Sequence, residues 1–251
     1  MEHARRRYRA VVAYDGTDFW GFQLQARERT VQGEIEKALN RLTGSPIRID
    51  AAGRTDAGVH ATGQVIAFNA VWKHSLPDLH RALNAVLPDD IVVQRLEIAS
   101  TTFHPRFDAL SRTYQYQIIN QPWPDVLLRR YAWHIAKPLD GTAMQRAASY
   151  LVGEHDFASF GKPPQGQNTV RRVLRADWST ENTRLTFTIT ANAFLYRMVR
   201  NIVGTLVQAG MGLMEPEAVQ QILAERDLKK SAPPAPAHGL CLVQVTYPEE
   251  A

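Results

Sequence analysis

Residues 51 to 65 of the chain read Ala51-Ala52-Gly53-Arg54-Thr55-Asp56-Ala57-Gly58-Val59-His60-Ala61-Thr62-Gly63-Gln64-Val65. Three glycines recur in this stretch at intervals of five, and β-like runs precede it (47–50) and follow it (64–68). Glycine tolerates positive φ and lets another backbone approach closely. The pattern therefore predicts a tight loop that presents Asp56, its one acid, at the end of a strand.

The composition is that of a globular protein with a mild basic excess. The 251 residues include 29 Lys and Arg against 25 Asp and Glu, which permits a polyanionic partner without requiring one. No apolar run approaches the length of a membrane span, and the basic N-terminus lacks the apolar core of a secretion signal. The single cysteine, Cys241, forbids an internal disulfide, fits the cytoplasm, and is expected to be a small core residue.

Four further motifs accompany the Asp56 loop. They are Tyr14-Asp15-Gly16-Thr17, Arg29-Thr30-Val31-Gln32-Gly33, Phe103-His104-Pro105-Arg106-Phe107 and Met198-Val199-Arg200-Asn201-Ile202-Val203-Gly204. Together with residues 53–61 they resemble, in order and spacing, the TruA-type tRNA pseudouridine synthases, and the resemblance covers nearly the whole chain. It implies an isomerase that converts uridine to pseudouridine at positions 38, 39 and 40 of the tRNA anticodon stem-loop. It also implies a homodimer that uses no cofactor and no metal.

Local patterns predict the elements of the first part of the chain. Residues 8–14 and 91–98 are typical of strands, and 64–68 continue the loop as another. Thr30 is expected to cap a helix that ends at Gly44, because apolar residues recur at helical spacing between them. Ser75 and Asp78 indicate a capping box at the start of a second helix.

The succession of predicted strands and helices begins again after Phe107. Strands are expected at 112–119, 173–178, 185–191 and 240–247, and helices at 141–151, 194–209 and 216–225. Residues 231–238, which include three prolines, are interpreted as a linker.

Strands mixed with helices in two halves, 1–108 and 109–251, favour an α+β fold with a largely antiparallel sheet. No G-x-G-x-x-G and no G-x-x-x-x-G-K-[ST] motif occurs, so nucleotide-cofactor motifs are absent from the sequence. The family resemblance implies the same fold class: two similar α/β halves that share one continuous, mostly antiparallel sheet, with a basic cleft between them.

Asp56 allows three interpretations. An aspartate beside glycine often caps a backbone N–H of a turn. Asp56 and His60, four residues apart, could belong to a metal-dependent hydrolase, although the chain offers no third ligand at a convincing spacing. The resemblance makes Asp56 the catalytic aspartate, which acts on the ribose of the target uridine.

Two residues of the second half are implied to complete the site. A carboxylate shielded from water resists ionisation unless a cation lies near it, and the resemblance pairs Arg200 with the catalytic acid. It also places Tyr114 against the target base. From pattern alone, Arg200 could be a solvated helix arginine, and Tyr114 could be a core residue that alternates with Tyr116.

The remaining candidates are contacts to RNA. Arg54 is expected to grip a phosphate or the flipped nucleotide, although a surface arginine in a loop would look the same. Phe103, His104, Pro105, Arg106 and Phe107 mix aromatic rings with a cation, which suits stacking and phosphate contact. Two core phenylalanines around a turn would give the same pattern. The basic pairs and runs at 5–7 and 171–172 are interpreted as solvated.

One segment departs from the family. Residues 161–168 read Gly161-Lys162-Pro163-Pro164-Gln165-Gly166-Gln167-Asn168, where relatives often have a cysteine-containing loop. A catalytically silent RNA-binding protein of the same fold is an alternative to the enzyme, and it would tolerate loss of Asp56. The joint presence of Asp56, Tyr114 and Arg200 favours the enzyme.

Overall fold

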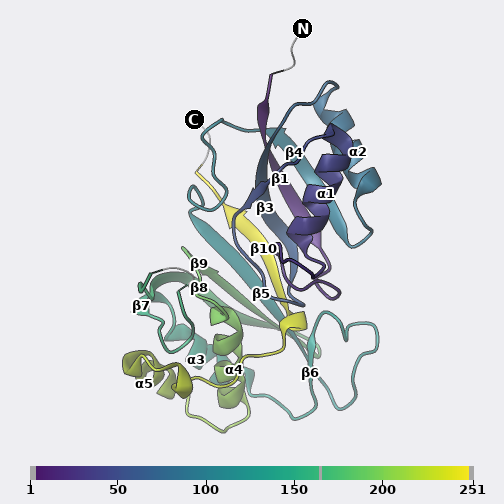
Figure 1. Cartoon of the computed structure of the whole chain (residues 1–251). Helices are drawn as coiled ribbons and strands as arrows, with labels where there is room; N and C mark the ends of the chain where they lie inside the picture. Colours follow the sequence, from purple (N-terminus) through teal and green to yellow (C-terminus); the bar gives the residue numbers. More distant parts are fainter. Residues whose placement is uncertain (1–3, 164–165, 249–251) are drawn as a thin grey trace. The chain divides into compact units, whose positions relative to one another are not determined.

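The computed structural model describes residues 4–163 and 166–248, which form two compact units (Figure 1). The first unit contains the chain up to Leu110 and takes in the C-terminal segment again from Leu242. The second unit runs from Ser111 to Cys241. The final strand therefore belongs mostly to the first unit, although more than one hundred residues separate it from the other strands there.

The first unit is a sheet covered by two helices. Its elements are β1 (Arg6–Tyr14), α1 (Val31–Thr43), β2 (Ile49–Ala51), β3 (His60–Ala70), α2 (Leu76–Val86), β4 (Ile91–Ile98) and β10 (Leu240–Thr246). The strand order is β4-β1-β3-β10, and the short β2 also pairs with β3. The pairs β1/β3, β1/β4 and β2/β3 are antiparallel. In Figure 1, α1 and α2 lie side by side over this sheet, and α2 contacts β4.

Both helices of the first unit begin where the sequence predicts, and α1 also ends there. Thr30 accepts a hydrogen bond from the backbone N–H of Gly33, and Gly44 ends α1 in the left-handed conformation, with φ of 69°. Ser75 and Asp78 form both bonds of the capping box that starts α2. These bonds satisfy backbone donors that a helix terminus otherwise leaves without partners.

The second unit has the same kind of architecture. Its elements are β5 (Ser111–Asn120), β6 (Trp133–Ile135), α3 (Gly141–Ser149), β7 (Gly153–Asp156), β8 (Val170–Glu181), β9 (Arg184–Ala191), α4 (Met198–Gly210), α5 (Ala218–Glu225) and two short 3₁₀ turns, η1 (Leu228–Lys230) and η2 (Ala237–Gly239). The strand order is β5-β9-β8-β7, all antiparallel, and β6 pairs with β5 in parallel. α3 packs on both α4 and β8. The predicted α+β class with mostly antiparallel strands is confirmed.

The helix start at Phe194 and the burial of Cys241 were both predicted incorrectly. The helix expected from Phe194 begins at Met198, because Arg197 has a φ of 60° and cannot continue a right-handed helix. Cys241, expected in the core, is only half-buried. Among the described residues, no helix is long and apolar enough to cross a membrane.

Candidate active site

The Asp56 loop is held from one side by the segment that follows β1. The N–H of Phe22 donates to the carbonyl of Thr55 at 3.0 Å, and the hydroxyls of Tyr14 and Thr55 share a hydrogen bond of 2.8 Å. The N–H of Val59 donates to the carbonyl of Asp56 at 3.1 Å, which closes a turn over residues 56–59. The carbonyls of Thr55 and of Asp56 itself are thus fixed by backbone bonds, and the side chain of Asp56 is half-buried.

Gly16 brings a second stretch of backbone against the same loop. A Cβ atom on Gly16 would lie 2.1 Å from the carbonyl oxygen of Val59, so only glycine fits there. The N–H of Gly16 donates to Nδ1 of His60 at 3.0 Å. Oδ1 of Asp15 lies 3.1 Å from the same nitrogen, which cannot accept from Gly16 and donate to Asp15 at once. In either protonation state the buried ring of His60 ties the loop to the turn at residues 14–17.

The glycines predicted to shape the loop have separate structural roles. Gly58 has a φ of 77° and so makes the turn beside Asp56. Gly63 lies inside β3, where a Cβ would meet the carbonyl oxygen of Val243 in β10 at 2.1 Å. The predicted combination of positive φ and close backbone approach is confirmed, although Gly63 belongs to the strand that follows the loop.

A metal centre at this loop finds no further support. His60 is buried, and its Nδ1 accepts the backbone N–H of Gly16 in the turn at residues 14–17. Within residues 4–163 and 166–248, no three His, Cys, Asp or Glu side chains are grouped so that they could hold a metal ion. Arg54, two residues before Asp56 in the chain, is exposed.

Tyr114 lies on the buried face of β5 with Tyr116 and Ile118, as the alternation predicts. It is paired across the sheet with Ile189 of β9. Its ring meets the ring of Phe194 edge-on, with centroids 5.0 Å apart. Phe194 lies just before the start of α4, and packing against its ring holds the Tyr114 ring at a fixed angle.

Arg200 lies in the first turn of α4 and is half-buried. Its Nε donates to the carbonyl of Ala235 at 2.7 Å. Burial raises the pKa of the Tyr116 hydroxyl, and the nearby Arg200 guanidinium lowers it by less. The N-terminal end of a helix also carries a partial positive charge. Arg200 and the helix end together favour an anion at this place.

The structure separates the members of the 103–107 motif. The ring of Phe103 packs 5.2 Å from the ring of Tyr247. Pro105 is buried, and its carbonyl accepts from the Tyr247 hydroxyl at 2.7 Å. Phe107, by contrast, is 75% exposed. Its ring lies 4.3 Å from that of His104, and the guanidinium of Arg106 lies 5.8 Å from it. Phe107 is therefore the exposed residue of the motif, and the half-buried His104 and Arg106 lie beside its ring.

One of the basic residues interpreted as solvated is in fact structural. Arg7 is only 8% exposed. Its guanidinium donates to Asp50 at 2.7 Å and to the carbonyl of Phe103 at 2.8 Å. The side chain links β1 to the start of the 103–107 motif, so the expectation of a solvated arginine at this position is wrong.

Sequence reasoning did not select Tyr196 and Arg197, which precede α4. Tyr196 is exposed, and the guanidinium of Arg197 lies 5.0 Å from its ring. The N–H of Tyr196 donates to the carbonyl of Lys162, so the divergent segment 161–168 begins beside this pair. Pro164 and Gln165 of that segment lie outside the described residues. An aromatic residue followed by an arginine, close to the start of a helix, is the sequence signal that could have identified this pair.

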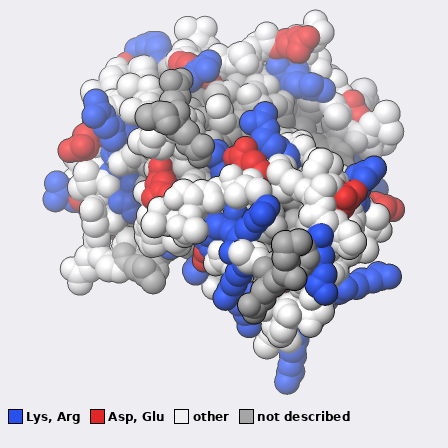
Figure 2. Space-filling model, turned by 90° about the horizontal axis from the view of Figure 1, so that it is seen from above, with Lys and Arg blue, Asp and Glu red and all other residues white. Residues whose placement is uncertain are grey.

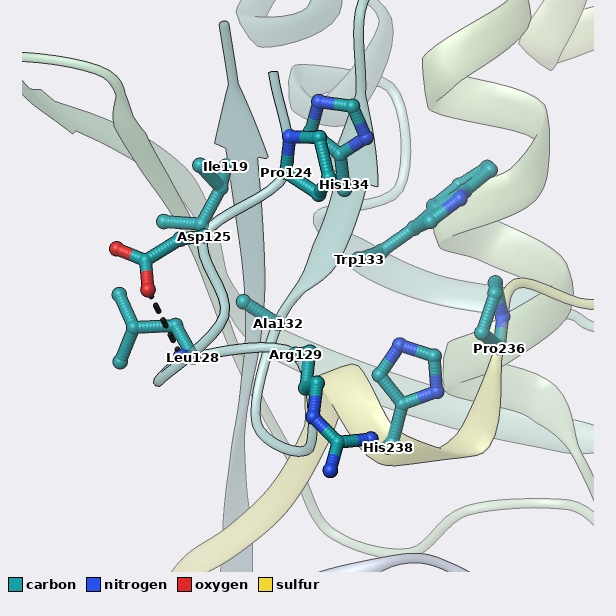
Figure 3. Close-up of a pocket in the computed structure, with 10 residues that line it drawn as sticks. All are labelled: Ile119, Pro124, Asp125, Leu128, Arg129, Ala132, Trp133, His134, Pro236 and His238. Atoms are coloured by element: carbon teal, nitrogen blue, oxygen red, sulfur yellow. Dashed lines mark hydrogen bonds between the residues drawn. The ribbon is translucent and has the colours of Figure 1, made fainter.

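A pocket of about 350 Å³ lies in the second unit, away from the predicted residues (Figure 3). Its lining comprises Ile119, Pro124, Asp125, Leu128, Arg129, Ala132, Trp133, His134, Pro236 and His238. Figure 3 shows the Asp125 carboxylate bonded to the N–H of Leu128, at 3.0 Å, so this acid caps its own loop. Because the lining includes no predicted site residue, we do not assign the chemistry to this pocket.

Charges of both signs occur on the surface. Figure 2 shows lysines and arginines standing out from the face that it draws, with acids interspersed among them. This matches the modest formal charge of +4. Contact with a polyanion would therefore depend on local groups of cations rather than on the net charge.

Comparisons with known proteins identify the family of the chain. A sequence model of the family described as "tRNA pseudouridine synthase" matches residues 10–108 and 147–248. The chain is 48% identical over 243 residues to "tRNA pseudouridine synthase A" of Brevibacillus brevis, covering 96% of this chain and 100% of that protein. The proteins of the same name from Moorella thermoacetica and Thermotoga maritima are 47% and 43% identical, cover 94% and 96% of this chain, and are themselves covered over 98% and 100% of their lengths.

Among solved structures, the chain resembles one described as "Crystal structure of the archaeal box H/ACA sRNP Nop10-Cbf5 complex". The match has 10% identity and a TM-score of 0.34, and it covers 80% of this chain but 43% of that one. This weak likeness adds nothing to the sequence relationship, which extends over the full length of the curated relatives.

Proposed function

The chain belongs to the tRNA pseudouridine synthase family, and on that premise we propose that it isomerises uridine to pseudouridine in the anticodon stem-loop of tRNA, at positions 38, 39 and 40. The observation that carries the proposal is the Asp56 loop. Its carboxylate stands on a glycine-shaped turn that hydrogen bonds hold to the segment after β1. Such a rigid support is what a catalytic group requires.

The reaction rearranges one nucleotide and consumes nothing. The bond from C1′ to N1 breaks, the uracil turns over while bound, and a bond from C1′ to C5 forms. The hydrogen of C5 leaves to solvent, and N1 gains a proton. No water needs to be activated, so a single acid is sufficient, and no second carboxylate is required beside Asp56.

Asp56 acts on the ribose in its ionised form. A carboxylate can attack C1′ as a nucleophile or remove a proton from the sugar, and both routes require the negative charge. We assign Arg200 as the cation that stabilises this charge. Its place in the first turn of α4 supports the assignment, because the helix end and the guanidinium both favour an anion.

Tyr114 and Arg54 are assigned to the target nucleotide. The target base must leave the RNA stack before it can turn, which costs a few kcal/mol. Tyr114, fixed edge-on against Phe194, offers a ring to the base and a hydroxyl to a proton transfer from C5. Arg54, exposed beside the catalytic acid, would hold the phosphate of the flipped nucleotide.

The 103–107 motif is assigned to the RNA around the target. The exposed Phe107 forms a cluster with the half-buried His104 and Arg106, and stacked aromatic rings beside a guanidinium suit single-stranded or loop RNA. Phe103 and Pro105 support this cluster through Tyr247. We further propose that the protein works as a homodimer in the cytoplasm, without cofactor or metal.

The proposal is tested by release of tritium from C5 of uridine in a tRNA transcript. Release by the wild-type protein, in the presence and absence of EDTA, is the expected result. Transcripts in which only one of the three target positions carries labelled uridine would then show which of them is modified. Tight binding of tRNA without release would instead favour a silent RNA-binding protein, and loss of activity in EDTA would favour a metal enzyme.

A further inference from the structure

Residues 232–236, which we name the strap, were expected to be a linker, but they lie bonded along α4. The N–H of Ala232 donates to the hydroxyl of Thr205 at 3.1 Å, and that hydroxyl donates to the carbonyl of Asn201 at 2.9 Å. The N–H of Ala235 donates to the carbonyl of Arg200 at 3.0 Å. The strap is thus attached to the helix at two points, Arg200 and Thr205, which are about one and a half turns apart.

Gly204 lets the strap lie directly on the helix. A Cβ on Gly204 would be 2.2 Å from the carbonyl oxygen of Pro233, which is backbone and cannot move alone. Gly204 has no positive φ to explain it, and glycine inside a helix is destabilising by roughly 1 kcal/mol relative to alanine. The close approach of the strap supplies the reason for this glycine.

The far end of the strap is fixed to the sheet. The Tyr116 hydroxyl donates to the carbonyl of Pro236 at 2.8 Å, and Tyr116 is completely buried in β5. Because burial raises the pKa of this hydroxyl, it keeps its proton and remains a donor. The strap is therefore clamped between the first turns of α4 and the core of the second unit.

The consequence falls on Arg200. Ala235 accepts from Nε of Arg200 at 2.7 Å while its own N–H donates to the Arg200 carbonyl. A bond at Nε fixes the plane of the guanidinium, and hence the direction of its two terminal nitrogens. An arginine has several rotatable bonds, and the strap selects one conformation from them.

We propose that the strap is the positioning element for Arg200, and that Thr205 and Gly204 are positioning residues for the isomerisation. This inference rests on the role of Arg200 proposed above. A strap that is shifted leaves the guanidinium present but misdirected. The rate at which bound tRNA is isomerised then falls. The affinity for tRNA stays the same, because the strap itself is not assigned to RNA contact.

Two substitutions shift the strap by different means. Gly204→Ala places a methyl group against Pro233, and Thr205→Val removes the acceptor of the Ala232 N–H. Thr205→Ser keeps the hydroxyl and is the conservative counterpart. Gly210→Ala is the matched control, since it lies on the same helix but its Cβ would meet the flexible side chain of Met144, at 2.6 Å from the sulfur.

The experiment measures single-turnover tritium release, the Kd for tRNA and the melting temperature of each full-length variant. We expect Gly204→Ala and Thr205→Val to slow turnover about 10- to 100-fold with Kd within about twofold of wild type, as misplacement of a catalytic group does. Thr205→Ser and Gly210→Ala should keep the wild-type rate. Strap variants at the wild-type rate, or a loss that Gly210→Ala shares at equal melting temperature, would overturn the inference.

Failure of the inference is distinguishable from failure of the proposed function. If wild type releases no tritium, the proposed activity is wrong. If wild type is active and Arg200→Ala keeps the full rate, the role of Arg200 is wrong and the inference falls with it. If Arg200→Ala is slow but the strap variants are not, only the positioning role of the strap is wrong.

Discussion

Replacing Gly16 by alanine perturbs the Asp56 loop without touching any assigned catalytic or RNA-binding residue. The new Cβ would lie 2.1 Å from the carbonyl oxygen of Val59, and real Cβ contacts do not fall below 3.0 Å. The separation must therefore grow by about 1 Å, which is the difference between these two distances. Val59 donates its N–H to Asp56, so the displacement passes directly to the turn that carries the carboxylate.

A misplacement of about 1 Å lowers turnover by roughly 100-fold. Forcing an extra methyl group into a packed site also costs about 1–3 kcal/mol of stability. The assay is single-turnover tritium release at a temperature where both proteins are folded, together with the melting temperature by circular dichroism. We expect Gly16→Ala to lose rate far in excess of what its folded fraction explains.

Gly44→Ala is the control for this prediction. Gly44 has a φ of 69° and open space around it, so alanine there is strained by about 1–2 kcal/mol but pushes nothing toward the loop. It should lower the melting temperature and leave the rate unchanged. Equal rates for Gly16→Ala and Gly44→Ala would refute the claim that Gly16 positions the catalytic loop.

Three further predictions test the other parts of the molecule. Arg106→Ala should reduce the salt dependence of tRNA binding by about one phosphate contact, whereas Phe107→Ala should weaken binding by about 1–3 kcal/mol at every salt concentration; identical salt slopes would contradict this division. Hydrogen bonds from the hydroxyl of Ser75, and to a smaller extent from Arg81, hold the pKa of Asp78 below its usual 3.8. The ionised carboxylate therefore stabilises the fold above that pH, and this stabilisation is lost as the pH falls through the folded pKa. Asp78→Asn should therefore melt lower than wild type at neutral pH and equally in strong acid, and a difference that persists in acid would argue against the linkage. Leu83→Ala should cost about 3 kcal/mol in urea unfolding, because Leu83 is 1% exposed, and a loss under about 1 kcal/mol would mean that the site collapses.

Features that depend on neighbouring residues were predictable from the sequence. The caps of α1 and α2 are set within a few residues, and each was found at its expected position. The alternation along β5 identified the buried face that carries Tyr114. The glycine spacing indicated the tight loop at Asp56, although it did not show which glycine makes the turn and which admits β10.

Features that depend on distant parts of the chain were not predictable. The return of β10 to the first unit involves residues far apart in sequence, as does the burial of Arg7 against Asp50. No local pattern reveals the left-handed Arg197 that delays α4. The prolines of residues 231–238 led to the prediction of a linker. The packing of this segment on α4 was missed because hydrogen bonds between a helix and a non-repetitive segment leave no periodicity in the sequence.

The 103–107 motif shows the same limit on a smaller scale. Its composition suggested RNA contact for all five residues, and the structure buries one of them and packs another against Tyr247. Which aromatic ring faces solvent depends on the C-terminal segment, and the motif itself contains no sign of it. The exposed Phe107 could be distinguished from the packed Phe103 only after the position of Tyr247 was known.

The central claim is that the Asp56 carboxylate performs the isomerisation. Its most direct test is tritium release from C5 of uridine in tRNA by Asp56→Asn, measured beside the Kd of the same variant for tRNA. Asparagine keeps the size of the side chain and removes its charge, so we predict no release while the affinity for tRNA stays within a few-fold of wild type. Release by Asp56→Asn at the wild-type rate would contradict the account, because the chemistry would then belong to another residue.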